Sequence, residues 1–259
     1  MHHQSERSIS VLASEESVNV SRHLALLGDD GYQLVTMVEA LYDALPSMCR
    51  FPLDVVTNDD AHAAGINAHL MMICRRQLTV GILTLMRGYR VDALAHLRKA
   101  VELCAFTVKM AKHPHMSRTW LVAGNSDAAW DKFRDKFTKL WPDDDPQVKS
   151  LEYTFDEASK AMHSSVYSVA HYLSEKRRVD GFPDIGVFDL TSDATFYAYF
   201  IRFIDCHLTI LALFQRTLKK YTGDTGASLL RLEGAKVAFS VKHREWMPVV
   251  ATAIHNVRT

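Results

Sequence analysis

Residues 94–108 read LAHLRKAVELCAFTV, and their apolar side chains recur with the period of an α-helix. The recurring positions are Leu94, Leu97, Val101, Cys104 and Val108. They are spaced alternately by three and four residues, which places them along one face of a helix. The pattern predicts a long amphipathic helix that buries this face against other helices.

The same spacing recurs in two longer segments and one shorter segment. Their apolar positions are Leu151, Phe155, Ala158, Met162, Val169 and Leu173; Phe196, Phe200, Phe203, His207, Leu211, Phe214, Leu218 and Tyr221; and Trp130, Phe133, Phe137 and Leu140. The prolines lie at positions 46, 52, 114, 142, 146, 183 and 248. They leave 53–113, 147–182 and 184–247 free of proline, so that helices can run through these tracts without interruption.

The spacing and the helix-ending residues together predict where helices begin and end. We expect helices at 14–27, 31–50, 60–87, 89–112, 115–123, 126–140, 146–176, 192–222 and 226–257. The expected N-caps are Asp59 or Asp60 for the helix near 60, and Ser192 or Asp193 for the helix near 192. Gly88 is expected to break the chain between two long helices, and Pro248 to kink or end the last one.

Strands play almost no part in this pattern. Only Val187–Leu190 is strand-like, and because four residues are too short for a sheet we expect an ordered loop there. No internal repeat or strong linker divides the chain. The predicted fold class is therefore all-α, a single-domain helical bundle of about seven to nine helices over 1–259. Its core bundle is expected at about 31–222, with a C-terminal helix at 226–257.

The composition excludes several classes of protein. The 259 residues contain 30 Lys and Arg against 30 Asp and Glu, and this net charge of zero is unlike a protein that coats nucleic acid or a membrane surface. A hydrophobic share of 48% is that of a globular chain and excludes disorder throughout. Charged residues interrupt the most apolar stretches, so no membrane span of ~20 uncharged residues is expected.

The cysteines and the N-terminus indicate the compartment. The four cysteines, Cys49, Cys74, Cys104 and Cys206, form no CxxC pair. Three of them lie in apolar periodic segments, which favours reduced, structural thiols in a cytosolic protein. Residues 1–10 lack the apolar region of a signal peptide, so we expect a cytoplasmic location.

Motifs of known cofactor and metal sites are missing from the sequence. It contains no GxGxxG, GxxxxGK[ST], GxSxG or HExxH, so neither a cofactor nor a metal is expected. The 13 histidines are a surplus, but several have ordinary explanations. His113 and His115 flank Pro114 at a helix end and favour an interaction with the helix dipole, whereas His207 lies in an apolar stripe and favours a hydrogen-bonded core histidine.

One constellation combines chemically useful side chains with a position beside the core. Arg98 and Glu102 are four residues apart, and their row borders the apolar stripe of residues 94–108. Ser159 and His163 are also four apart and border the stripe of the 146–176 helix. If the two helices pack together, all four residues converge and Glu102 orients His163. Two interpretations remain open: a structural network that locks two helices in register, and a functional pocket.

Around these residues the sequence resembles a family of uncharacterised bacterial helical proteins. The matching stretches are Leu85–Ala93 (LMRGYRVDA), Leu97–Glu102 (LRKAVE) and Ser159–Ser165 (SKAMHSS), whose shared marks are GY, LRx3E and Sx3H. The resemblance covers about Leu83–His171 and implies a distant similarity to HEPN-type helical domains, many of which act in toxin–antitoxin and phage-defence systems. HEPN nucleases place an arginine before their histidine, whereas this chain has Ser159 there.

Two functions are compatible with these residues. The first is a non-catalytic interaction module, with a second copy of the chain as partner in a homodimer. The alternative, implied by the resemblance, is a HEPN-like RNase that binds RNA through a local patch. In it His163 would be the general acid or base, Arg98 would stabilise phosphate charge and Glu102 would orient one of them. A third class, a bundle that binds a metal or small ligand, has no support from ligand spacing.

Overall fold

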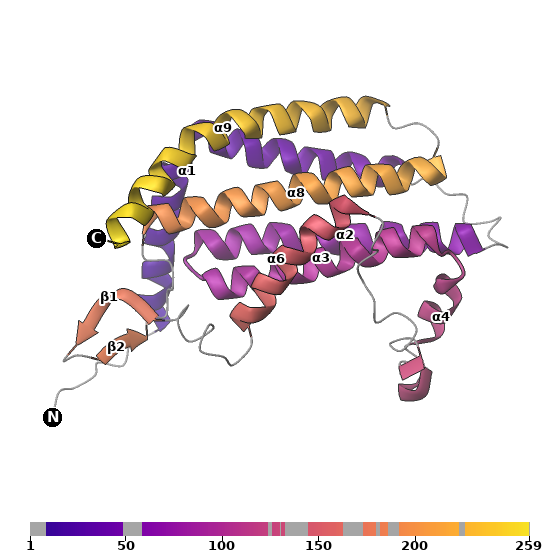
Figure 1. The fold of residues 1–259 in the computed structure, drawn as a ribbon, viewed down its shortest axis with the longest axis horizontal. Coiled ribbons are helices and arrows are strands. Elements are labelled where there is room, and N and C mark those ends of the chain that lie inside the picture. The colour runs from indigo at the N-terminus through magenta and orange to yellow at the C-terminus, as the bar shows by residue number, and fades with distance from the viewer. Residues whose placement is uncertain are drawn as a thin grey trace.

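The computed structural model describes residues 9–48, 59–123, 126–129, 131–132, 145–162, 173–179, 182–185, 192–222 and 226–258. Long helices make up most of this part of the chain and lie side by side in a bundle (Figure 1). The main helices are α1 (Ile9–Met48), α2 (Asp59–Met86), α3 (Arg90–Lys112), α4 (Met116–Ala123), α6 (Pro146–Met162), α8 (Asp193–Thr222) and α9 (Gly226–Arg258). The predicted all-α bundle is confirmed.

Helices break and begin where the sequence predicts. Within α1, Gly28 has φ 59° and ψ −173°, so that two helical segments are joined at one residue. Gly88, with φ 99°, separates α2 from α3. Glycine adopts positive φ without steric strain, which is why both breaks fall on this residue type. At the start of α8, Oγ of Ser192 accepts the backbone N–H of Thr195 at 3.2 Å and acts as the expected N-cap.

The segment after α6 differs from the prediction. The sequence pattern predicts a helix over 146–176, whereas α6 is described only to Met162 and residues 173–179 form a strand. This strand, β1 (Leu173–Val179), pairs antiparallel with β2 (Phe182–Ile185). The two residues between the strands in the sequence are Asp-Gly, a pair typical of β-hairpins, and this local preference outweighs the helical spacing of Leu173.

Other expected boundaries shift by small amounts or are not described. Asp59 and Asp60 lie in the first turn of α2 rather than ahead of it as N-caps. α9 continues through Pro248, and Figure 1 shows it curving towards its C-terminal end. The expected loop at 187–190 and most of the predicted helix at 126–140 lie outside the described residues.

α8 is the central helix of the bundle. It packs against α1, α2, α3, α6 and α9, and Figure 1 shows it between α9 and the α2–α3 pair. Its predicted apolar stripe is buried as far as Leu218, whereas the last member, Tyr221, is half-buried. The following residues are at most 1% exposed: Phe196, Phe200, Phe203, His207, Leu211, Phe214 and Leu218. By length and composition α8 could cross a membrane, but 67% of its apolar window is buried inside the bundle, as in the core helix of a bundle.

Gly81 is the point at which the α2 backbone approaches two neighbouring helices. A Cβ atom added at Gly81 would lie 2.6 Å from Cε1 of Phe203 on α8 and 3.2 Å from Cβ of His96 on α3. The Phe203 ring is fully buried and has no room to move aside. Glycine at this position therefore sets how closely α2 packs against α8.

Replacing Gly81 with alanine is expected to destabilise the fold by about 1–3 kcal/mol, because the added methyl group overlaps the Phe203 ring. Gly65→Ala in the same helix is the matched control. A Cβ atom there meets nothing within 4 Å, so alanine should stabilise α2 by up to about 1 kcal/mol through its helix propensity. Urea denaturation of both variants measures the difference, and equal effects on the unfolding free energy would contradict the close approach at Gly81.

Candidate functional site

α3 and α6 pack together, and a hydrogen bond joins them. Nε of Arg98 on α3 donates a hydrogen bond to Oγ of Ser159 on α6, at 2.8 Å. The guanidinium carbon of Arg98 lies 4.7 Å from the centroid of the Phe155 ring, one turn before Ser159. Two of the four residues singled out in the sequence therefore meet at the interface between their helices.

Glu102 does not join this contact. Its carboxylate pairs with Nζ of Lys99, three residues earlier on α3, at 3.2 Å. Arg98 contacts the neighbouring helix instead, which offers it both a hydrogen-bond acceptor and an aromatic face. His163 lies outside the described residues, so its convergence with Glu102 stays a prediction.

The surroundings of Arg98 favour a locking role for this contact. Ala105 on α3 and Ala158 and Ala161 on α6 are almost completely buried, and their small side chains let the two helices approach closely. Ser159 accepts its hydrogen bond from a cation, and no general base bonds to it among the described residues. The arrangement holds two helices in register, and within the described residues it does not activate a nucleophile.

A double-mutant cycle measures how strongly the contact of Arg98 with Ser159 holds α3 and α6 together. Arg98→Met, Ser159→Ala and the double variant are expected to give a coupling energy of about 1 kcal/mol, because the bond joins a charged donor to a half-buried hydroxyl. The matched control is the exposed pair on the same helix, tested with Lys99→Met and Glu102→Gln, whose coupling should stay below about 0.5 kcal/mol. Urea denaturation gives all the values, and a control coupling as large as that of Arg98 and Ser159 would contradict the lock.

A second group of chemically capable side chains lies in the core. It consists of Tyr42 on α1, Cys74 on α2, Cys104 on α3, and Cys206 and His207 on α8, all of them buried. The rings of Tyr42 and His207 lie edge to face with their centroids 5.9 Å apart. Sγ of Cys74 donates a hydrogen bond to the backbone oxygen of Ala100 at 3.3 Å. Four helices therefore meet at a centre rich in polarisable groups.

Burial keeps the thiols of this centre protonated. Desolvation raises the pKa of Cys74 well above its ordinary value, raises that of Cys104, and raises that of Cys206 to about 12. Because the thiolate is both the nucleophile and the metal ligand, these three side chains act as small hydrophobic groups. In the part of the chain that the structure describes, no group of three His, Cys, Asp or Glu residues is placed to hold a metal ion.

His207 is the core histidine that the sequence predicts. Its Nδ1 lies 2.8 Å from the backbone oxygen of Phe203, and because a carbonyl only accepts, Nδ1 must carry the proton. Its Nε2 is buried without a hydrogen-bond partner among the described residues. Desolvation lowers the pKa of His207 from 6.5 to about 4, and the bond to Phe203 opposes this shift only in part.

The neutrality of His207 makes the fold sensitive to acid. The pKa of His207 in the folded chain lies below its ordinary value of 6.5. The neutral His207 side chain therefore contributes its full stabilisation of the fold above pH 6.5, and this contribution is lost as the pH falls towards 4. Complete protonation of His207 is expected to lower the unfolding free energy by roughly 3 kcal/mol. We expect the unfolding free energy of the natural chain to fall more steeply over this range than that of His207→Gln, measured by urea titration at each pH. Parallel pH profiles would contradict this expectation.

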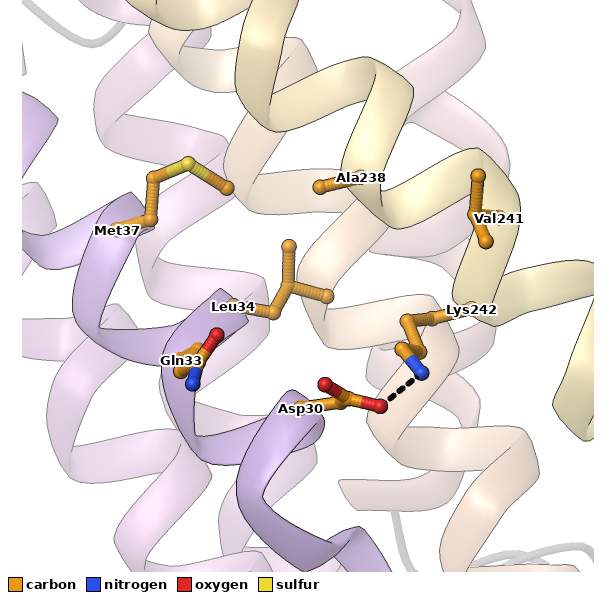
Figure 2. A pocket seen from close by; sticks show the side chains of 7 residues that line it. All are labelled: Asp30, Gln33, Leu34, Met37, Ala238, Val241 and Lys242. Atoms are coloured by element: carbon orange, nitrogen blue, oxygen red, sulfur yellow. Dashed lines mark hydrogen bonds and ion pairs between the residues drawn. The ribbon is translucent and has the colours of Figure 1, made fainter.

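A third feature is a groove on the surface between α1 and α9. Its volume is about 490 Å³, and it is lined by Asp30, Gln33, Leu34, Met37, Ala238, Val241 and Lys242. Figure 2 shows the apolar side chains of both helices grouped in the groove, with Asp30 and Lys242 joined by an ion pair at one side. The groove is therefore largely apolar, and charge marks one edge of it.

α9 carries apolar residues on two opposite faces. Its inner face consists of Leu232, Ala235, Phe239 and Trp246, which are buried. Its outer seam consists of Leu230, Gly234, Val237, Val241 and Pro248, which are exposed. Leu230 is 76% exposed, Val237 is 64% exposed and Val241 is 45% exposed. At about 100° per residue the outer seam forms a narrow line along the helix, opposite to the inner face and beside the groove.

The groove and the outer seam do not follow from the sequence pattern as a whole. Asp30 and Lys242, which pair across the groove, are 212 residues apart, and helical periodicity says nothing about such distant partners. A local signal does exist in α9, where apolar residues recur with a seven-residue spacing in two separate series. One series is Leu232, Phe239 and Trp246, and the other consists of Leu230 and Val237. Two apolar series on one helix indicate two contact surfaces.

Comparisons with family models, with curated proteins and with solved structures found no match to this chain. The resemblance to uncharacterised bacterial helical proteins and to HEPN-type domains therefore remains a prediction.

Proposed function

We propose that this chain is a non-catalytic interaction module that binds its partner through the outer seam of α9 and the groove beside it. The observation that carries the proposal is the exposed apolar seam on a helix whose opposite face is already buried in the core. A helix at the surface of a bundle ordinarily presents a polar face to water. Apolar side chains that continue along an exposed helix and border an apolar groove are typical of a protein–protein contact surface.

The groove adds the features of a binding surface. Leu34 forms an almost fully buried apolar floor, and Met37 and Val241 border it with partly exposed side chains. The ion pair of Asp30 with Lys242 supplies a polar edge. An apolar centre with a polar rim is the usual anatomy of protein interfaces.

The RNase alternative has less support from the described residues. It depends on His163, which lies outside them, and on Arg98 as the group that holds phosphate. Nε of Arg98 already donates to Ser159, and its guanidinium lies over Phe155. Phosphate binding at Arg98 would have to displace or share these contacts, so the interaction module is the function that we put forward.

Single cysteines on the surface test the proposed function. With Val237→Cys, we expect slower maleimide labelling in cells that naturally carry the chain than in dilute purified protein, because the partner covers the outer seam. Val18→Cys is the matched control, since Val18 on α1 is 63% exposed, almost as much as Val237. Peptide-resolved mass spectrometry separates these sites from the native cysteines. Equal labelling of Val237→Cys in the two settings, after correction by the Val18→Cys rates, would contradict the proposed function.

A further inference from the structure

We infer that the partner on the outer seam is a second copy of this chain, whose α9 packs antiparallel against the first across a two-fold axis. This inference rests on the proposed function and names the occupant of its surface. It follows from the spacing of the outer seam, from the charges beside it and from the area that the seam and groove offer together.

The spacing of the outer seam suits a helix-to-helix contact. Its first four members, Leu230, Gly234, Val237 and Val241, are spaced by four, three and four residues, which is the spacing of a coiled-coil seam. Gly234 lies within this line, and a Cβ atom there would meet nothing within 4 Å. A side chain from a second helix can therefore approach the α9 backbone at this point.

The charges beside the outer seam select an antiparallel second copy. When two α9 helices run in opposite directions with Val237 of each against Val241 of the other, Arg231 of each copy lies near Glu245 of the other. The same register places Arg244 near Glu233 of the other copy. A parallel pairing would instead bring Arg244 against its own counterpart. In the antiparallel arrangement the same surface of each copy therefore pairs its charges with those of the other copy, as a two-fold contact requires.

The outer seam alone offers too little area for a specific dimer contact, so the groove must take part in it as well. From Leu230 to Pro248 the seam is about 27 Å long at 1.5 Å per residue. A contact one helix wide along this length is too small for a specific interface, whereas a contact two helices wide approaches the lower end of that class. The second copy's α9 must therefore also rest on the α1 side of the groove, at Gln33 and Met37. We expect a dimer with micromolar affinity.

The net charge of the chain permits self-association. Its 30 basic and 30 acidic residues leave no formal net charge, so two copies approach without long-range repulsion. The two acidic residues beside the outer seam, Glu233 and Glu245, pair with Lys236 and Lys242 of their own helix. Such surface pairs are weak and can exchange for contacts across the dimer.

Sedimentation of the purified full-length chain tests the dimer. From about 1 to 200 μM the natural chain is expected to pass from monomer to dimer. Val237→Asp should raise the dissociation constant at least about tenfold, because each dimer would bury two carboxylates in the contact. Val18→Asp introduces the same change at a residue of almost equal exposure and should leave the constant unchanged. Circular dichroism verifies that the variants are folded.

Charge reversal tests the antiparallel register even if Val237→Asp fails to fold. Arg231→Glu and Glu245→Arg should each weaken the dimer by roughly 3- to 10-fold, since two like-charged contacts then form per dimer. The double reversal restores opposite charges across the two-fold axis and should return the dissociation constant to near its natural value. A double variant as weak as the single variants, or a natural chain that is monomeric at every concentration, would overturn the inference.

The two proposals fail in distinguishable ways. If the purified chain stays monomeric while Val237→Cys is protected in cells, the surface binds a different protein, so the second copy is wrong and the interaction module stands. If the chain dimerises but Val18→Asp disrupts the dimer and Val237→Asp does not, the contact lies elsewhere and the inference is overturned. If Val237→Cys is unprotected in cells, the proposed function itself is wrong.

Discussion

Burial of α8 is the constraint on which the rest of the structure depends. Because this helix presents large apolar side chains in several directions, every helix around it must supply a matching surface. α2 does so with Gly81, which has no side chain at the point where the Phe203 ring lies against it. α9 does so with Trp246, whose ring lies 5.6 Å from that of Phe200. α6 is fastened at its start by Asp145, which accepts the backbone N–H of Val148 and pairs with Arg216 on α8.

Much of this architecture could be predicted from local sequence, because local forces determine it. Glycine and proline limit where a helix continues, so the breaks at Gly28 and Gly88 and the cap at Ser192 fall where the sequence places them. The burial of the α8 stripe follows from apolar spacing alone. The hairpin of β1 and β2 does not follow from the apolar spacing, because Leu173 stands at a helical interval while the turn preference of Asp180-Gly181 favours the hairpin.

Contacts between residues that are distant in the sequence are harder to predict than the helices themselves. The meeting of Arg98 with Ser159 could be predicted from two helices that each place a polar residue beside an apolar stripe. Glu102 instead pairs with Lys99 on its own helix, and its predicted contact with His163 lies outside the described residues. The groove was not predicted at all, since its two walls lie at opposite ends of the chain. Surface complementarity arises only after folding has brought Leu34 and Val241 together.

If α9 binds a partner as proposed, its two faces would connect the stability of the chain to its association. The inner face of α9 packs against α8, where Trp246 contacts Phe200, and the outer seam is exposed. A partner that binds only the folded chain stabilises it by mass action, so occupation of the outer seam also strengthens the packing of α9 on the core. α1 borders the same groove and packs on α8, so the effect reaches the centre where Tyr42 lies against His207. Association through α9 would therefore stabilise the buried core that positions the binding surface.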